Sequence, residues 1–238
     1  GVLRYGVSYA LAGAEPREIV LSSAEAPTKP VRKAEADHLI DFESLKAEPD
    51  ELLSYFAWAE DVGPDGAVRR AEGDMYFAEV RHFEEIFRQG EQPSQQQQQQ
   101  QEQQQGGQQQ QAEQLAELQK QVVNGTWKVI RRETGAKPSA EFAEDVKTLQ
   151  EAQQQAIDQA ATVGERLQDE ASKKHLEAAV KAMNQAVDRL AASGAASDPA
   201  ALKPALAAEQ AAYQALLKLR AREFQVVRGR QQRSQGRQ

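Results

Sequence analysis

The first ninety residues alternate apolar and polar positions with the period of two that is typical of β-strands. In the opening segment the apolar residues are Leu3, Tyr5, Val7, Tyr9 and Leu11, and the residues between them are Arg4, Gly6, Ser8 and Ala10. Four further strands are predicted, over residues 18–21, 36–42, 52–60 and 75–80. Five short strands at this spacing favour a β-sandwich over residues 1–88, either complete or without its first strand.

Turn-forming residues separate these strands. Residues 24–30 hold two prolines and are expected to form a loop, and Gly63-Pro64-Asp65-Gly66 is the strongest turn signal in the chain. In the strand before that turn, the period of two places Leu53, Tyr55, Ala57 and Ala59 on one face.

Glutamine dominates residues 89–111, where Gln95 to Gln101 are consecutive. Such a tract has no apolar surface to bury, so its composition predicts a linker. Glutamine is nevertheless a fair helix former, so the end of the tract either is coil or continues the helix that follows. Gly106-Gly107 is expected to interrupt any helix there.

Residues 112–228 show helical periodicity and are predicted to form an antiparallel bundle or coiled coil of about four helices. The first is expected to end near Glu133, with Gly135 as its stop signal. Pro138-Ser139 then opens the second helix, with Ser139 as N-cap. Its apolar positions recur at alternating spacings of four and three, as in a coiled-coil heptad, with one polar exception: Phe142, Val146, Leu149, Gln153, Ala156, Ala160, Val163 and Leu167.

A third helix repeats that spacing out of phase, at Leu176, Val180, Met183, Val187 and Leu190. Either a break within residues 169–174 or a stutter in one long helix explains the shift. Residues 192–197 are small and end the third helix, after which Asp198-Pro199 forms an N-cap with proline at the first helical position. Pro204 either kinks the fourth helix or marks its start.

Alanine occupies several heptad positions, which allows the helices to approach closely. These are Ala156, Ala160, Ala179 and Ala186. The pattern favours packing within one chain, because short helices joined by tight breaks fold on one another, and it also permits self-association between chains.

Composition excludes several kinds of chemistry. The chain has 238 residues, a net charge of −7, three histidines and no cysteine, which rules out disulfides and thiolate metal sites. No stretch approaches the ~20 apolar residues that span a bilayer. Because the first residue is Gly rather than Met, we expect the sequence to be a piece of a longer protein.

Few residues are candidates for chemistry. Asp61, Asp65 and Asp74 offer oxygen ligands for calcium, but turn formation explains them better because their spacing fits no calcium loop. The pairs Glu84-Glu85 and Glu144-Asp145 are interpreted as solvated acids rather than acid–base pairs. His38, His82 and His175 are scattered, and no nucleophile, phosphate-binding or zinc motif occurs. We therefore predict no enzyme activity, no catalytic, cofactor-binding or metal-binding residue, and no small-molecule substrate.

Charge is distributed unevenly. Residues 1–90 hold 10 Lys+Arg against 18 Asp+Glu, whereas residues 218–238 hold 7 against 1. The basic end includes a Gln/Arg tail over residues 229–238 and suggests an alternative function, binding of nucleic acid or anionic lipid. The arginines concerned are Arg220, Arg222, Arg228, Arg230, Arg233 and Arg237.

The stretch YFAWAED at residues 55–61 resembles the penultimate strand of bacterial immunoglobulin-like domains. The resemblance implies that Tyr55 packs inward near a corner and that Asp61 organises the following loop. With DMYFAEVRHFEEIFRQGEQ at residues 74–92, the Gln/Gly tract and LAELQKQVVNGTWKVIRRE at residues 115–133, the whole layout resembles a group of large bacterial envelope proteins with transmembrane helices near their N-terminus. That group has no agreed catalytic residues.

The second resemblance implies a membrane-anchored bacterial parent whose extracytoplasmic region includes this chain. The expected function is therefore a non-enzymatic structural or interaction segment of the periplasmic face. It would display an immunoglobulin-like sandwich and a helical bundle on a Gln-rich spacer, and would bind a protein partner or self-associate through its helices.

Overall fold

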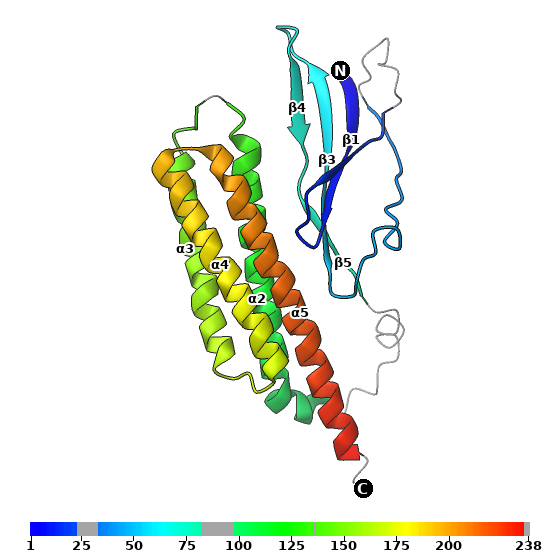
Figure 1. The fold of residues 1–238 in the computed structure, drawn as a ribbon, viewed down its shortest axis with the longest axis vertical. Coiled ribbons are helices and arrows are strands. Elements are labelled where there is room, and N and C mark those ends of the chain that lie inside the picture. The colour runs from blue at the N-terminus through cyan, green and yellow to red at the C-terminus, as the bar shows by residue number, and fades with distance from the viewer. Residues whose placement is uncertain (23–32, 82–97, 136, 236–238) are drawn as a thin grey trace. The chain divides into compact units, whose positions relative to one another are not determined.

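The computed structural model describes residues 1–22, 33–81, 98–135 and 137–235, with side chains in the two longest helices described for residues 110–132 and 202–226. The chain divides into two compact units, Gly1–Val80 and Arg81–Gln238. The first is an antiparallel sheet and the second is helical (Figure 1). The predicted order of β structure followed by α structure is confirmed.

All five described strands belong to one sheet. They are β1 (Val2–Leu11), β2 (Arg17–Val20), β3 (Leu52–Val62), β4 (Val68–Glu72) and β5 (Tyr76–Glu79). The order is β2-β1-β3-β4, and β5 pairs with the opening half of β3. The predicted sandwich is not confirmed, because the described residues contain no second sheet.

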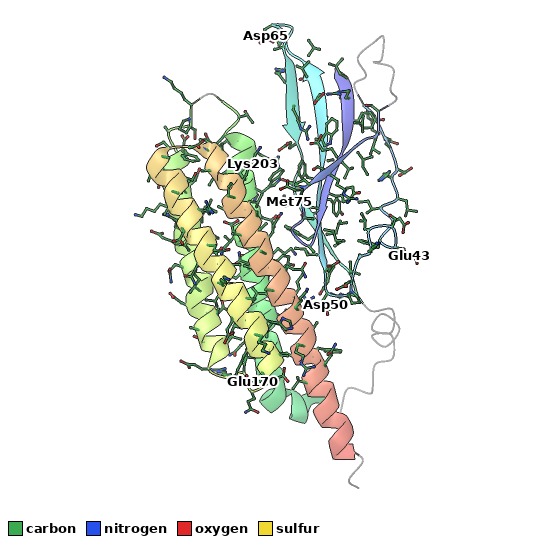
Figure 2. The ribbon with its side chains drawn as sticks, viewed as in Figure 1. Glu43, Asp50, Asp65, Met75, Glu170 and Lys203 are labelled. Carbon is green, nitrogen blue, oxygen red and sulfur yellow. The ribbon has the colours of Figure 1, made fainter. Side chains whose placement is uncertain are left out.

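One predicted strand is absent from the described residues, and one observed strand was not predicted. Residues 36–42 form no strand: they are mostly exposed, Leu39 is 86% exposed, and charged residues interrupt the alternation that would give a buried face. β4 was not predicted, because its sequence Val-Arg-Arg-Ala-Glu has a single large apolar residue. Its place is fixed by the Gly63–Gly66 turn, where Gly66 adopts a φ of 81° and Asp65 lies at the tip of the hairpin (Figure 2).

The small residues of β1 lie on its more buried face. Gly6, Ser8 and Ala10 are buried, whereas Tyr5 and Val7 are half-buried. Gly6 pairs with Trp58 of β3, and the indole ring lies directly over it. The sequence pattern correctly gives the alternation of β1, but the large apolar side chains occupy the more open face.

Helix α2 (Gln98–Arg132) begins inside the range assigned to the linker and runs through Gly106-Gly107. The glycine pair therefore does not interrupt the helix, and the tract is helical from Gln98 onward. The expected loop at residues 24–30 and most of the linker ahead of Gln98 lie outside the described residues.

Three more helices follow: α3 (Phe142–Gly164), α4 (Glu170–Ala196) and, after the short η1 (Pro199–Ala201), α5 (Leu202–Gln235). A true break therefore separates α3 from α4. Asp198 caps η1 with Pro199 at the first helical position, as expected, and Asp169 caps α4, which was not predicted. Pro204 marks the start of α5, since it lies in the first turn, where a missing N–H costs nothing.

The N-cap prediction for Ser139 is wrong, because Glu141 occupies that position and α3 begins at Phe142. Ser139 instead donates two hydrogen bonds to Glu133, from its backbone N (2.7 Å) and its hydroxyl (2.6 Å). Burial opposes ionisation of Glu133, but these bonds and Arg132 outweigh it and lower its pKa. Ser139 thus closes the turn between α2 and α3 rather than capping α3.

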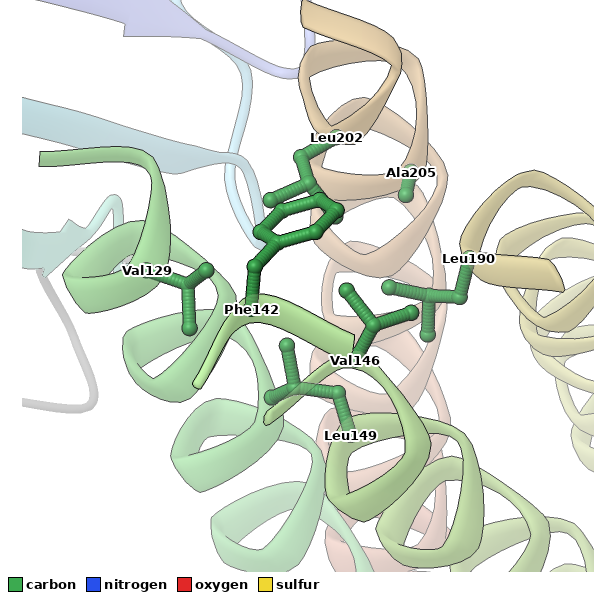
Figure 3. Close-up of a cluster of buried hydrophobic side chains, with 7 residues drawn as sticks. All are labelled: Val129, Phe142, Val146, Leu149, Leu190, Leu202 and Ala205. Carbon is green, nitrogen blue, oxygen red and sulfur yellow. The ribbon is translucent and has the colours of Figure 1, made fainter. Parts of the chain in front are cut away.

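The four helices form an antiparallel bundle in which α2 contacts α3 and α5, and α4 contacts α3 and α5 (Figure 1). The heptad positions predicted for α3 are all buried. In α4, Val180 and Val187 are only half-buried, because the buried stripe is centred on Leu176, Ala179, Met183, Ala186 and Leu190. A cluster at one end joins all four helices (Figure 3): Val129, Phe142, Val146, Leu149, Leu190, Leu202 and Ala205.

Candidate functional site

An apolar groove of about 470 Å³ crosses one face of the sheet. Cross-strand pairing places Tyr5 opposite Ala59 and Val7 opposite Ala57, so these four side chains share a face. Ala71 of β4, opposite Ala59, extends the row. The alanines leave room that larger side chains would fill.

Residues 33–36, at the start of the second described stretch of the chain, form one wall of this groove. Ala34 and Ala36 line it together with Leu21. Between them, Glu35 forms an ion pair with Lys33 (2.5 Å) in which both side chains are about four-fifths exposed. Residues 33–40 form no strand, and Ala57 and Ala71 are exposed, so the groove is open to solvent.

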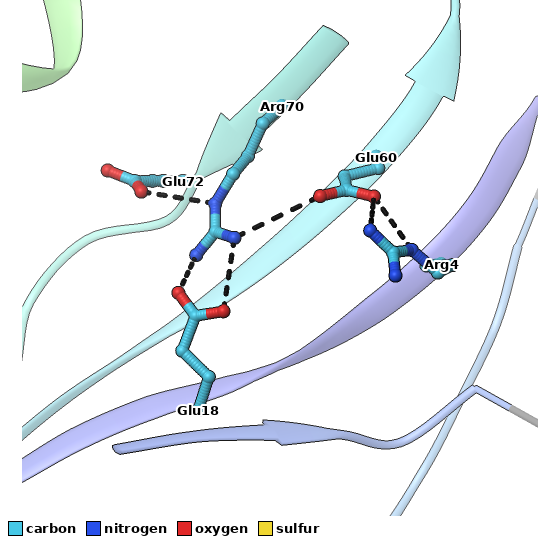
Figure 4. Close-up of polar contacts among 5 residues, drawn as sticks. All are labelled: Arg4, Glu18, Glu60, Arg70 and Glu72. Carbon is cyan, nitrogen blue, oxygen red and sulfur yellow. Dashed lines mark hydrogen bonds and ion pairs between the residues drawn. The ribbon is translucent and has the colours of Figure 1, made fainter. Parts of the chain in front are cut away.

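The opposite face of the sheet holds a charged network (Figure 4). Arg70 binds Glu18 (2.5 Å), lies 3.3 Å from Glu72 and 3.9 Å from Glu60, and Glu60 in turn accepts two hydrogen bonds from Arg4 (2.7 and 2.9 Å). The network joins β1, β2, β3 and β4. It contains three acids and two arginines, so most of its charge is neutralised internally.

A layer of polar side chains lies in the core of the bundle. The amides of Gln119 on α2 and Gln153 on α3 exchange two hydrogen bonds (3.0 and 2.8 Å). Thr126, also on α2, donates to the carboxyl of Glu209 on α5 (2.8 Å). All four residues are fully buried. Burial raises the pKa of Glu209 to about 8, against the smaller opposite effect of the Thr126 hydrogen bond.

A second polar cluster lies where α4 begins and packs against the later part of α5. Asp169 accepts hydrogen bonds from Arg222 through both carboxylate oxygens (2.9 Å each) and from the backbone N of Ser172 (3.0 Å). Arg222 is the main reason that the pKa of Asp169 is well below its usual range. The Ser172 hydroxyl donates to the buried Glu223 (2.5 Å). This arrangement fixes the start of α4 against α5.

Two of the three candidate calcium ligands, Asp61 and Asp65, serve other roles. Asp61 pairs with Arg69 across the β3–β4 hairpin (2.7 Å), and the Asp65 carboxylate accepts from the backbone N of Ala67 within the turn. Among the described residues no group of three or more His, Asp or Glu side chains is arranged to hold a metal ion. The roles that the resemblance implies for Asp61 and Tyr55 stay predictions; the half-buried Tyr55 stacks on Tyr76, with ring centroids 5.6 Å apart.

The remaining candidates are separated from one another. Asp145 pairs with Arg132, and Glu144 is exposed. His38 is exposed in the sheet unit, His175 is half-buried in α4, and His82, Glu84 and Glu85 lie outside the described residues. The structure therefore brings none of the described acids and histidines that we considered for acid–base chemistry into a common site.

The basic end of the chain is only partly described. Arg222 is occupied by Asp169. The backbone of α5 continues to Gln235, which places Arg228, Arg230 and Arg233 on a helix, and Arg237 lies outside the described residues. Within the described helices, none has the length and apolar character that crossing a membrane requires.

Sequence reasoning missed most of the polar layer, although a signal for it exists. On α2, Gln119 and Thr126 continue the heptad spacing of Leu115, Val122 and Val129. On α5, Glu209 continues the spacing of Leu202, Leu206, Tyr213 and Leu216. Only Gln153 was singled out, as the one polar exception in the heptad of the second helix.

Comparison of the chain with protein-family models, curated proteins and solved structures found no match. The function is therefore inferred from the two units themselves.

Proposed function

We propose that the chain is a non-enzymatic interaction segment of a larger membrane-anchored bacterial protein, located on the extracytoplasmic side. The observation that carries the proposal is the open apolar groove on a small, separately folded sheet unit. A helical bundle follows it through a Gln-rich tract. The envelope location and the parent protein rest on the sequence resemblance alone.

The partner of the groove is an extended peptide segment with alternating apolar and basic side chains. Alternation matches the groove because side chains of an extended strand point to opposite sides, so every second one meets the sheet. The apolar side chains fit the space over Ala57, Ala59 and Ala71. The basic ones point away from the sheet and are attracted at longer range by the net negative charge of residues 1–90, which hold 18 Asp+Glu against 10 Lys+Arg.

Synthetic peptides test this proposal directly. A peptide of alternating valine and lysine is expected to bind the full chain in a fluorescence anisotropy titration, whereas alternating valine and glutamate is not. Ala57→Arg places a bulky cation on the exposed floor of the groove and is expected to weaken binding at least about tenfold, through steric exclusion and like-charge repulsion.

Two controls separate the groove from general charge attraction. Ala67→Arg adds the same charge in the β3–β4 turn, away from the groove, and is expected to leave the affinity within about twofold. A peptide of alternating serine and lysine tests the apolar contribution. The proposal fails if this peptide binds as tightly as the valine peptide, or if Ala57→Arg and Ala67→Arg have equal effects.

Three finer predictions belong to the same proposal. An immunoglobulin-like sandwich requires further strands packed on the described sheet, and a solution structure of the native protein tests for them. The coiled-coil prediction is supported by the heptad spacing of the buried positions in α3. The extracytoplasmic location is tested by protease digestion of spheroplasts, in which the segment is expected to be cleaved without lysis.

The alternative function, binding of nucleic acid or anionic lipid through residues 229–238, stays a prediction. It is tested by titrating DNA, and separately vesicles with anionic headgroups, against the full chain at several salt concentrations. If deletion of residues 229–238 leaves affinity and salt dependence unchanged, the tail has no such role.

A further inference from the structure

Glu209 is an unusual residue for the centre of a helical bundle. Its side chain is fully buried between α5 and α2. One carboxyl oxygen accepts the hydroxyl of Thr126, and the other has no hydrogen-bond partner among the described residues. A buried carboxylate normally has a cation or several donors beside it, because an uncompensated charge is costly in an apolar interior.

Among the side chains that the structure describes, no charged group pairs with the Glu209 carboxyl. The nearby buried polar residues are Gln119 and Thr126 on α2 and Gln153 on α3, all neutral. The buried positions described for α4 are apolar or serine, and its titratable residues are exposed or, in the case of Lys173 and His175, half-buried. On α5 itself the buried ionisable residues described are Tyr213, one turn away, and Glu223, four turns away. The geometry is therefore that of a neutral carboxylic acid.

We propose that Glu209 makes opening of the α2–α5 seam proton-coupled. The closed seam holds the carboxyl in its protonated form, and when the two helices separate, the O–H bond breaks and the proton passes to water. The seam is the contact between α2 and α5 that contains Thr126 and Glu209. Solution pH thereby controls how often this contact opens.

The direction of the effect follows from the two protonation states. In the closed bundle the pKa of Glu209 is raised to about 8, and in the open state it returns toward 4.5. Below both values neither state releases a proton, so the seam is at its most stable. Between them, opening releases one proton, and the opening equilibrium rises about tenfold for each pH unit. Above both values the dependence disappears.

Amide hydrogen exchange of the full chain, corrected for the intrinsic pH dependence of exchange, measures this opening. Protection of α2 and α5 around Thr126 and Glu209 is expected to fall about tenfold per pH unit between about pH 5 and about pH 8, with a smaller change in α3. Glu209→Gln keeps the size of the side chain but cannot ionise, so its protection is expected to be independent of pH over that range.

Glu223→Gln is the matched control, because it neutralises the other buried acid of α5 and is expected to leave the slope unchanged.

Thr126→Val gives a second test that does not need the Glu209 variant to fold. Removing the hydroxyl donor favours the neutral acid further, so the dependence is expected to extend to higher pH. Infrared absorption of a neutral carboxyl at pH 7, lost in Glu209→Gln, reports the same proton.

The proposal is overturned if Glu209→Gln retains the wild-type slope or if Thr126→Val leaves its upper limit unchanged. It is also overturned if protection falls equally in all four helices, because the proton would then be released by global unfolding.

Discussion

The guanidinium of Arg70 lies 4.4 Å from the centroid of the Trp58 ring, so that the centre of the charged network rests on a buried indole. The contact holds the edge strand β4 to β3 through a cation–π interaction, beside the longer Arg70–Glu60 ion pair (3.9 Å). It also explains how a strand with almost no apolar residues is stably placed in the sheet.

Replacing Arg70 with Met is therefore expected to destabilise the sheet unit by about 1 kcal/mol. A fully buried ion-pair network would contribute more, but the Arg70 side chain is 30% exposed and water screens its charge. Urea unfolding followed by Trp58 fluorescence in a Trp127→Phe background measures it. Arg69→Met, at the preceding position, removes the exposed ion pair with Asp61 and is expected to have a much smaller effect on stability. Equal effects would contradict the role given to Trp58.

Gly6 is required by the close approach of its neighbours. A Cβ atom at this position would lie 2.0 Å from the backbone oxygen of Ile19 and 2.7 Å from the Trp58 ring. Gly6→Ala is expected to cost more than about 3 kcal/mol, since the backbone contact cannot be relieved by a side-chain rotation. Gly13→Ala is the control: its φ of 74° is unfavourable for alanine but nothing lies nearby, so about 1 kcal/mol is expected. Thermal unfolding compares the two.

The Gln119–Gln153 pair is expected to show strong coupling. Gln153→Leu or Gln119→Leu leaves a buried amide without its partner and is expected to cost about 1–3 kcal/mol. The double replacement removes both amides, and its cost is expected to be smaller than the sum of the single costs by about 1–2 kcal/mol. Additive costs in chemical denaturation would show that the two amides act independently.

Asp169 is expected to govern the acid sensitivity of the bundle. Because Arg222 and Ser172 lower its pKa, its carboxylate contributes stability above its ordinary pKa of 3.8, and this contribution is lost as the pH falls toward the lowered value. Asp169→Asn keeps a capping oxygen but loses the ion pair with Arg222. Below about pH 4 its stability is expected to fall less steeply than that of the wild type, as measured by helical circular dichroism.

The periodic parts of this fold were readable from the sequence, and the parts held by polar contacts were not. The seam of α3 was predicted residue by residue, because apolar burial imposes its spacing directly on the sequence. β4 was missed because Arg70 is placed by Trp58 and Glu18, which lie far away in the chain. Ser139 looked like a cap until the structure paired it with Glu133.

In the candidate sites, too, the periodic positions were readable from the sequence and the contacts between distant segments were not. The shared face of Tyr55, Ala57 and Ala59 was predicted, but not the groove, whose wall includes Ala36, the first residue of a strand that the structure does not form. Glu209 had the right spacing for a core position, yet an acid at such a position is normally taken as a surface residue. Only the placement of Thr126 opposite it shows that the carboxyl is accommodated.

The two longest helices, α2 and α5, extend beyond α3 at the same end of the bundle. α2 has 35 residues and α5 has 34, against 23 in α3, a difference of about 17 Å in length at 1.5 Å per residue. Because they are antiparallel, the chain enters the bundle through α2 and leaves it through α5 at that one end (Figure 1). A mechanical pull on the flanking chain therefore loads the two helices in an unzipping geometry, turn by turn, which yields at lower force than shear along the bundle axis.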